Sequence, residues 1–282
     1  MRVEMPKKMN FKLDVEGEGP LTDRHTAEFL ANEHFDEIYI RRQKLFSVAD
    51  AKKIEVIRSV FNISIWCDIT RAAVRYLISR PNLTELVLFG LKPSGRLSGF
   101  ENARNMKYFS CLYGLNGSDL LEVAKLPSLQ KLGAQRAHIT EDSILALLEK
   151  PLLTDVDFED SNFDDNFAGL VARSTTITSL ELGCNRITKI GLEKLCSMTQ
   201  LKKLDIWSVN IVESDIDMLA QLPNLDYLSL GGHDEQTIFT VEGTLARLYK
   251  LPSLKKIWLD GFRLTRDQRN TLNERYEEVT VT

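Results

Sequence analysis

Residues 175–198 read TTITSLELGCNRITKIGLEKLCSM, and residues 199–222 read TQLKKLDIWSVNIVESDIDMLAQL. When the two segments are aligned at an offset of 24, their apolar residues coincide. The matched residues are Ile177, Leu180, Leu182 and Ile187 in the first copy and Leu201, Leu204, Ile206 and Ile211 in the second. The shared pattern is L-x-x-L-x-L-x-x-N-x-L, followed by a short amphipathic stretch. The chain therefore contains a sequence repeat, which constrains its whole fold.

Each copy combines two periodicities. The L-x-L centre alternates with period two, which is typical of a short strand with one buried face. The following stretch, such as residues 188–198, spaces its apolar residues as a helix does. One strand–helix unit cannot bury its own apolar face, but a stack of such units can.

The first apolar position of the pattern recurs along nearly the whole chain. It falls on Phe35, Val60, Leu83, Met106, Leu129, Leu153, Ile177, Leu201, Leu225 and Leu254. A weaker copy lies upstream, with polar Asn10 at the first position and Leu13 and Val15 as its alternating pair. Most steps are 23 to 25 residues, and the last is 29. A chance run of apolar residues would not keep this register, so we expect about eleven repeats.

This pattern and its spacing resemble the leucine-rich repeat. The resemblance implies an α/β fold: a right-handed, horseshoe-shaped solenoid with a parallel β-sheet on the concave face and helices on the convex face. We expect one solenoid over residues 1–282. Residues 1–34 would form an N-terminal capping repeat, 35–251 the central repeats, and 252–282 the last repeat and C-terminal cap.

Several local features refine this prediction. Leu/Ile-Thr pairs open the helical stretches, and Thr22, Thr140, Thr188 and Thr265 are candidate helix N-caps. The asparagine of the family pattern survives only as Asn185, so we expect a less regular turn in the other copies. The long last step places about five extra residues in 231–243, which we predict to form a mobile surface loop.

Composition excludes several classes of protein. The net charge is −4 and the isoelectric point is near 5.7, and no basic stripe occurs, which disfavours nucleic-acid binding. No apolar run approaches the roughly 20 residues of a membrane span. The N-terminal segment lacks the apolar core of a secretory signal. The 4 cysteines have no C-x-x-C spacing, so we expect a reducing, cytoplasmic location.

Catalytic chemistry is poorly represented, so we do not expect an enzyme. The histidines lie in separate repeats and pair with no Cys or Asp at a useful spacing, and no phosphate-binding, metal-binding or nucleophile motif occurs. Cys67 and Cys184 fall on exposed template positions and are more simply read as inert thiols. We expect no catalytic residue, no metal and no cofactor.

Aromatic residues gather on the strand positions that should point out of the sheet, which are the third, fifth, seventh and eighth of each copy. They are Tyr39, Trp66, Phe89, Tyr108, Tyr113, Trp207, Tyr227 and Trp258, and they include all 3 tryptophans. Large aromatics on an open sheet face are costly to leave in water unless a partner covers them. Trp and Tyr also dominate the energetics of interfaces.

Acidic residues at these same positions form a band in the middle of the expected arc. They are Asp155, Asp157, Glu159 and Asp160 in one copy, followed by Glu181, Asp205 and, in the last copy, Asp260. Two readings are open. The acids could simply keep a long sheet soluble while the aromatics stack on one another. Alternatively, aromatics and acids together form a surface for a protein partner with a basic, partly apolar patch.

The second reading is similar to the chemistry of ribonuclease inhibitors, and the short repeats look like those of cytosolic bacterial leucine-rich proteins, some of which are immunity proteins. The resemblance implies protein binding on the concave face by an inhibitor or immunity-type protein that caps a basic partner. The alternative is an adaptor that recruits a client into a larger assembly. For either function we expect a monomer that contacts neither nucleic acid nor membrane.

Overall fold

The computed structural model describes residues 12–17, 21–30, 36–42, 44–57, 60–232 and 239–282. The chain divides into two compact units. Unit 1 comprises residues 1–114 and 125–129, and unit 2 comprises residues 115–124 and 130–282. We describe each unit by itself, and the expectation of one solenoid over residues 1–282 stays a prediction.

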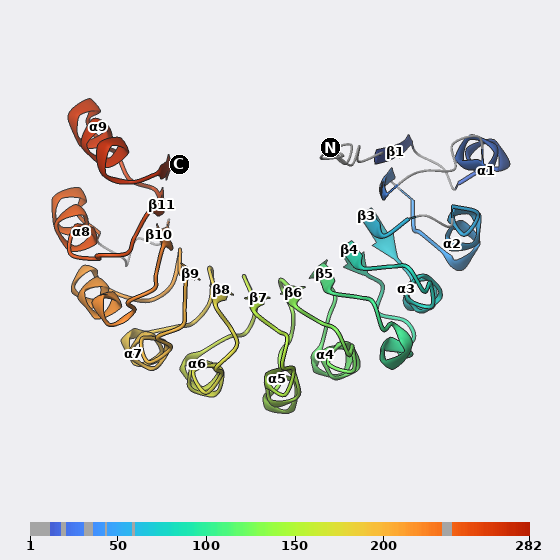
Figure 1. Cartoon of the computed structure of the whole chain (residues 1–282), viewed down its shortest axis with the longest axis horizontal. Helices are drawn as coiled ribbons and strands as arrows, with labels where there is room; N and C mark the ends of the chain where they lie inside the picture. The colour runs from blue at the N-terminus through green and yellow to red at the C-terminus, as the bar shows by residue number, and fades with distance from the viewer. Residues whose placement is uncertain (1–11, 18–20, 31–35, 43, 58–59, 233–238) are drawn as a thin grey trace, which may run out of the picture. The chain divides into compact units, whose positions relative to one another are not determined.

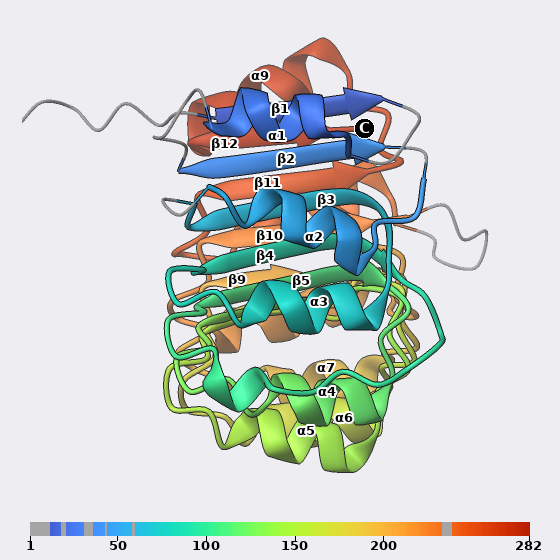
Figure 2. The same ribbon diagram turned by 90° about the vertical axis from the view of Figure 1, so that its right-hand side faces the viewer.

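Unit 1 alternates strands and helices in the predicted order. Its elements are β1 (Lys12–Gly17), α1 (Asp23–Leu30), β2 (Glu37–Arg42), α2 (Val48–Ile54), β3 (Asn62–Ile69), α3 (Arg71–Ile78), β4 (Glu85–Leu91), the 3-10 helix η1 (Phe100–Asn102) and β5 (Tyr108–Tyr113). Neighbouring strands pair in parallel, in sequence order from β1 to β5. Figure 2 shows β1, β2 and β3 side by side and running in one direction.

Unit 2 continues the alternation. Its elements are α4 (Gly117–Val123), β6 (Lys131–Ala134), α5 (Glu141–Leu148), β7 (Asp155–Asp157), α6 (Asp165–Val171), β8 (Ser179–Glu181), α7 (Lys189–Leu195), β9 (Lys203–Asp205), the 3-10 helix η2 (Glu213–Gln221), β10 (Tyr227–Gly231), α8 (Val241–Leu248), β11 (Lys256–Asp260), α9 (Arg266–Arg275) and β12 (Glu278–Val281). The strands again pair in parallel and in sequence order. Helices α5, α6 and α7 lie on one side of these strands (Figure 1).

The template leucines form the core, which confirms the register. Among the described residues, the first, fourth and sixth positions of every copy are buried. Leu180 and Leu204 are each 0 % exposed and occupy paired positions on β8 and β9. Every repeat therefore presents its strand apolar face to the helices, as the α/β repeat class requires.

The predicted threonine caps are confirmed at three helices. The side-chain oxygens of Thr140, Thr188 and Thr265 accept backbone N–H bonds at the starts of α5, α7 and α9. Each cap satisfies an N–H group that has no partner within its own helix. These threonines thus fix where the chain turns from strand to helix.

The eighth template position differs from the prediction. In unit 2, Arg136, Asp160, Cys184 and Ser208 have φ between 49° and 57°, so the backbone turns sharply there through the left-handed region. In β3 the pairing shifts between Ile65 and Asp68, and Cys67 is buried rather than exposed. In unit 2 the eighth position is therefore a turn and not a regular part of the strand face, whereas in unit 1 it stays within β3, β4 and β5.

Asn185 acts as the sequence predicts. Its buried amide donates to the carbonyl oxygen of Phe158 at 2.8 Å and accepts the N–H groups of Ser161 and Phe163. One repeat earlier, the Ser161 hydroxyl accepts the N–H of Ala137 at 3.1 Å. A serine therefore bonds the backbone of the preceding repeat there, as Asn185 does in the next copy. The middle of the 231–243 insertion, residues 233–238, lies outside the described residues.

Candidate functional site

Three carboxylates line up across the strand face of unit 2. Asp157 on β7, Glu181 on β8 and Asp205 on β9 occupy directly paired positions. Neighbouring strands lie about 4.8 Å apart, so three acidic side chains on one face are close neighbours. We call Asp157, Glu181 and Asp205 the carboxylate row.

The two outer members of the carboxylate row are tied to the backbone that follows them. Asp157 accepts the N–H of Glu159 at 2.9 Å and the side-chain amide of Gln135 at 2.7 Å. Asp205, only 4 % exposed, accepts the N–H of Trp207 at 3.3 Å. These bonds hold each carboxylate over the end of its own strand.

Burial makes ionisation of the two outer members of the row, Asp157 and Asp205, unfavourable. It raises the pKa of Asp157 to about 7, with the charge of Glu181 adding to the effect. Burial likewise raises the pKa of Asp205 to about 6, again with a contribution from Glu181. The row therefore carries less negative charge at neutral pH than three ordinary carboxylates would.

Trp207 lies beside the carboxylate row. Its indole ring covers Gly183, where an added Cβ would come within 2.2 Å of the ring nitrogen. Nearby, the pKa of Glu159 is raised mainly by burial and next by the charge of Glu181. The glycine one repeat earlier therefore creates the space in which Trp207 packs.

Basic residues offset much of the predicted acidic band. Lys203 pairs with Glu181 at 2.8 Å, Lys131 with Asp155 at 3.7 Å, and Arg136 with Asp160 at 2.8 Å. All six side chains are at least one-third exposed, so these pairs stabilise the fold little. They do make the net negative charge of the face smaller than the number of acidic residues alone suggests.

The remaining predicted residues of unit 2 lie toward its C-terminal strands. Lys203 sits over the ring of Tyr227, 5.1 Å from its centre. Trp258, 38 % exposed, donates from its indole nitrogen to the hydroxyl of Thr282 at 3.0 Å, and that hydroxyl donates to Asp260 at 2.7 Å. Trp258 and Asp260 are thus joined through one threonine.

Unit 1 brings together three other predicted aromatics. Trp66 and Phe89 have ring centres 6.4 Å apart, and Phe89 meets Tyr113 edge-on at 5.1 Å. We call Trp66, Phe89 and Tyr113 the aromatic row. Tyr39 on β2 and Tyr108 on β5 occupy other positions of the sheet, paired with Ser64 and Glu85 respectively.

Sequence reasoning missed the residues that fix these aromatics. Tyr113 donates to Asp68, which is ion-paired with Lys92, and the ring crosses Gly90. The sequence carries a usable signal, because Gly90 and Gly183 hold the same template positions as Tyr113 and Trp207 one repeat later. A glycine one repeat before a large aromatic indicates that the aromatic ring lies across the preceding strand.

The structure shows no arrangement with evident catalytic or metal-binding chemistry in the residues it describes. No group of three or more His, Cys, Asp or Glu side chains among them could hold a metal ion. Cys67, Cys111 and Cys196 are buried, and burial raises the pKa of Cys196 to about 12, which keeps it a thiol. Within the same residues, no helix is long and apolar enough to cross a membrane.

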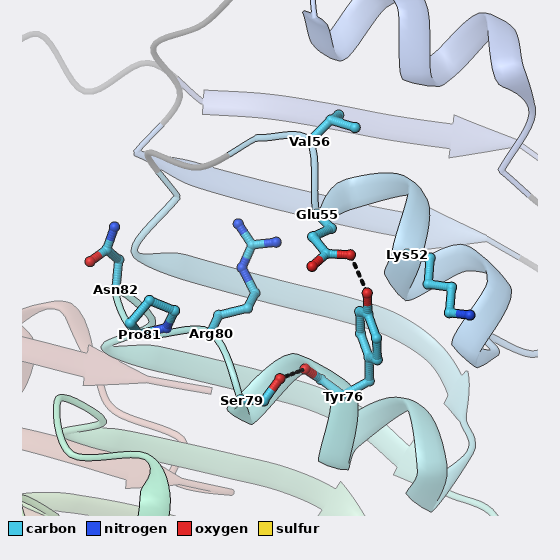
Figure 3. A pocket seen from close by; sticks show the side chains of 8 residues that line it. All are labelled: Lys52, Glu55, Val56, Tyr76, Ser79, Arg80, Pro81 and Asn82. Atoms are coloured by element: carbon cyan, nitrogen blue, oxygen red, sulfur yellow. Dashed lines mark hydrogen bonds between the residues drawn. The ribbon is translucent and has the colours of Figure 1, made fainter.

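A hollow in unit 1 lies between α2 and α3. It has a volume of about 500 Å³, and Tyr76 donates to Glu55 across it (Figure 3). Arg80 donates to the carbonyl oxygen of Ile54, where α2 ends. A hollow of about 590 Å³ occupies the corresponding place between α5 and α6 in unit 2. Because these hollows recur with the repeat, they follow from helix packing and do not by themselves indicate a ligand site.

Comparison with known proteins identifies the fold. No family model matches the sequence. A TLR13–ssRNA13 complex matches with a TM-score of 0.57 and 17% identity, over 90% of this chain and 40% of that chain. An internalin (inlF) from Listeria monocytogenes matches with a TM-score of 0.49 and 17% identity, over 96% of this chain and 86% of that chain. The repeat register, the parallel strands and the likeness to the TLR13 structure establish a leucine-rich-repeat fold.

Proposed function

We propose that this chain is a protein-interaction module, and that the strand face of unit 2 caps a partner protein with a basic, partly apolar surface. The observation that carries this proposal is the position of Trp207 next to the carboxylate row. A large, partly exposed aromatic near the partly exposed carboxylate of Asp157 suits a Lys or Arg side chain, which needs both an apolar stem contact and a counter-charge.

The electrostatics of the row support a cationic partner. Asp157 and Asp205 ionise reluctantly because burial removes the water that would stabilise their charge. An arriving ammonium or guanidinium group would supply that stabilisation, which would lower both pKa values and release protons. Glu181 already has Lys203 as a partner and Asp205 is only 4 % exposed, so a cation would bind chiefly Asp157.

An inhibitor or immunity-type role is our first interpretation, and an adaptor role is the second. Both use the same surface, and they differ in what happens to the partner. A capped enzyme or toxin loses activity, whereas a recruited client keeps it. A monomeric, cytoplasmic, non-enzymatic protein without cofactors or nucleic-acid partners remains our expectation under either role.

The proposal can be tested by affinity capture from the native lysate. We expect wild type and Ile190→Ala to capture the same protein, because Ile190 is a 60 % exposed residue on α7, away from the strand face. Trp207→Ala should lose most of that protein. Equal capture by Trp207→Ala would contradict the proposed surface. Adding the purified chain to the captured partner then separates inhibitor from adaptor through the partner's own activity.

A further inference from the structure

The aromatic row of unit 1 is built on other strands than the carboxylate row of unit 2. Trp66 is 46 % exposed and Phe89 is 37 % exposed, yet the two rings touch each other on adjacent strands. Scattered exposed apolar residues are normal on protein surfaces, but contiguous exposed aromatics mark interaction sites. The two exposed rings therefore need a covering group that the chain described here does not supply.

The surface is held rigid from beneath. Tyr113 cannot swing away, because its hydroxyl donates to Asp68 and Lys92 pairs with the same carboxylate. This hydrogen bond to Asp68 is the main cause that raises the pKa of Tyr113 to about 12, so the phenol stays neutral at physiological pH. A Cβ at Gly90 would come within 2.1 Å of the Tyr113 ring, so glycine is required there. A rigid surface loses little entropy when a partner binds.

The sheet around the aromatic row carries little unpaired charge. The fifth template positions of β3, β4 and β5 are Ser64, Val87 and Ser110, and they pair directly with one another. The seventh position of β5 is Leu112, in line with Trp66 and Phe89. Nearby ionic groups are the Asp68–Lys92 pair, Glu85 at the start of β4, and Arg41 on β2, which lies in line with Trp66 and pairs with Glu16 at 3.5 Å. A face whose charges are mostly paired already gives a buried cation or anion little free counter-charge.

We propose that Trp66 and Phe89 form a second docking surface, which takes an uncharged protein segment bearing aromatic or aliphatic side chains. Charge matching favours this occupant over a basic segment, which would lose its hydration here without gaining an ion pair. It also disfavours a nucleic acid, because Lys92 and Arg41 are already paired with Asp68 and Glu16, and phosphates need free cations. This surface does not depend on the carboxylate row.

Peptide selection tests the chemistry of the occupant. A phage-displayed library of random peptides is panned on the purified full chain, on a double variant with Trp66→Ser and Phe89→Ser, and on Phe61→Ser. Phe61 is 42 % exposed and lies outside the aromatic row, so it is a matched control. We expect wild type and Phe61→Ser to enrich uncharged peptides with aromatic or aliphatic residues, and the double variant to recover roughly tenfold fewer.

Fluorescence then locates the bound peptide. With Trp207→Phe and Trp258→Phe, Trp66 is the sole indole of the chain. A selected peptide should shift its emission to the blue as water leaves the ring. A pool dominated by Lys and Arg, equal recovery by the double variant, or an unshifted Trp66 would each overturn the proposal. So would oligo(dT) binding, or a dimer in sedimentation, that the double variant abolishes, because the occupant would then be a nucleic acid or a second copy of the chain.

Discussion

Asp157 and Asp205 hold equivalent positions two repeats apart, one on each side of Glu181, and each accepts the backbone N–H of the residue two positions ahead. Both carboxylates therefore have a structural role in addition to the proposed binding role. The same carboxylates that would contact a partner also accept backbone N–H groups just beyond the ends of β7 and β9.

The first prediction concerns pH and Asp157. Its pKa rises from an ordinary value of 3.8 to about 7, chiefly through burial. A group whose folded pKa is raised contributes stability below its unfolded pKa, and that contribution is lost as the pH rises through the folded value. The contribution of Asp157 to the free energy of unfolding of wild type should therefore fall as the pH rises from about 4 to about 7.

Asp157→Asn removes the titration and keeps an oxygen that can accept the Glu159 N–H. The variant should lose less stability than wild type when the pH is raised from about 5 to about 8. Urea unfolding at the two pH values measures the difference. If wild type and Asp157→Asn lose the same stability, the pKa of Asp157 is not raised in the folded protein.

The second prediction concerns the repeat core. Leu180 is 0 % exposed, so Leu180→Ala should destabilise the protein by about 2–5 kcal/mol through lost apolar burial and a cavity. Ile190→Ala, at a 60 % exposed position on α7, should stay within about 0.5 kcal/mol. Denaturant unfolding compares the two, and similar small losses would show that the register does not govern stability.

The third prediction concerns the space beneath Trp207. Gly183→Ala would place a methyl group 2.2 Å from the indole nitrogen, so the ring must move. In a background with Trp66→Phe and Trp258→Phe, the emission of Trp207 should change. Gly169→Ala is the control, because its Cβ meets only the flexible side chain of Lys194, at 3.2 Å. An unchanged spectrum in the Gly183 variant would mean that the indole does not pack on this strand.

The fourth prediction concerns the insertion. Removing five residues from 233–238 should restore a step of 24 and leave the protein folded. Phe239 should be kept, because its ring lies 6.2 Å from that of Phe262. Thr240 should be kept as well, because it caps α8 and donates to Glu213 at 2.7 Å. Thermal unfolding monitored by circular dichroism measures the effect, and a large fall in Tm would show that the deleted residues are packed.

The sequence predicts the core well because burial follows one period. Once the repeat register is correct, Leu180, Leu204 and the residues at equivalent positions are assigned to the core. The surface contacts are harder to predict, because they depend on the reach of side chains across repeats. Tyr113 reaches Asp68, which lies 45 residues earlier in the chain, and no pattern position links the two.

The carboxylate row shows the same limit of prediction from the repeat pattern. The shared fifth position of Asp157, Glu181 and Asp205 is readable from the repeat, and it correctly predicts that they are neighbours. The ion pair between Lys203 and Glu181 joins a third position to a fifth position, so template counting does not reveal it. Burial of Asp205 likewise depends on how neighbouring side chains pack over it.

The central claim is that the acidic face of unit 2 binds a basic partner. A variant neutralised at four positions serves to test it: Asp155→Asn, Asp157→Asn, Glu159→Gln and Asp160→Asn. A control with the same charge change alters exposed acids on the helix side of the unit: Glu141→Gln, Asp142→Asn, Glu149→Gln and Glu193→Gln. Circular dichroism first confirms that both variants are folded, because Asp157 also holds backbone groups.

The most direct measurement is the association rate of the captured partner across a series of salt concentrations. Electrostatic attraction speeds association and weakens as salt rises. The neutralised variant should associate more slowly than wild type and the control, with a flatter dependence on salt, whereas Trp207→Ala should mainly dissociate faster. If the neutralised variant keeps the wild-type association rate and salt dependence, the acidic face does not bind the partner.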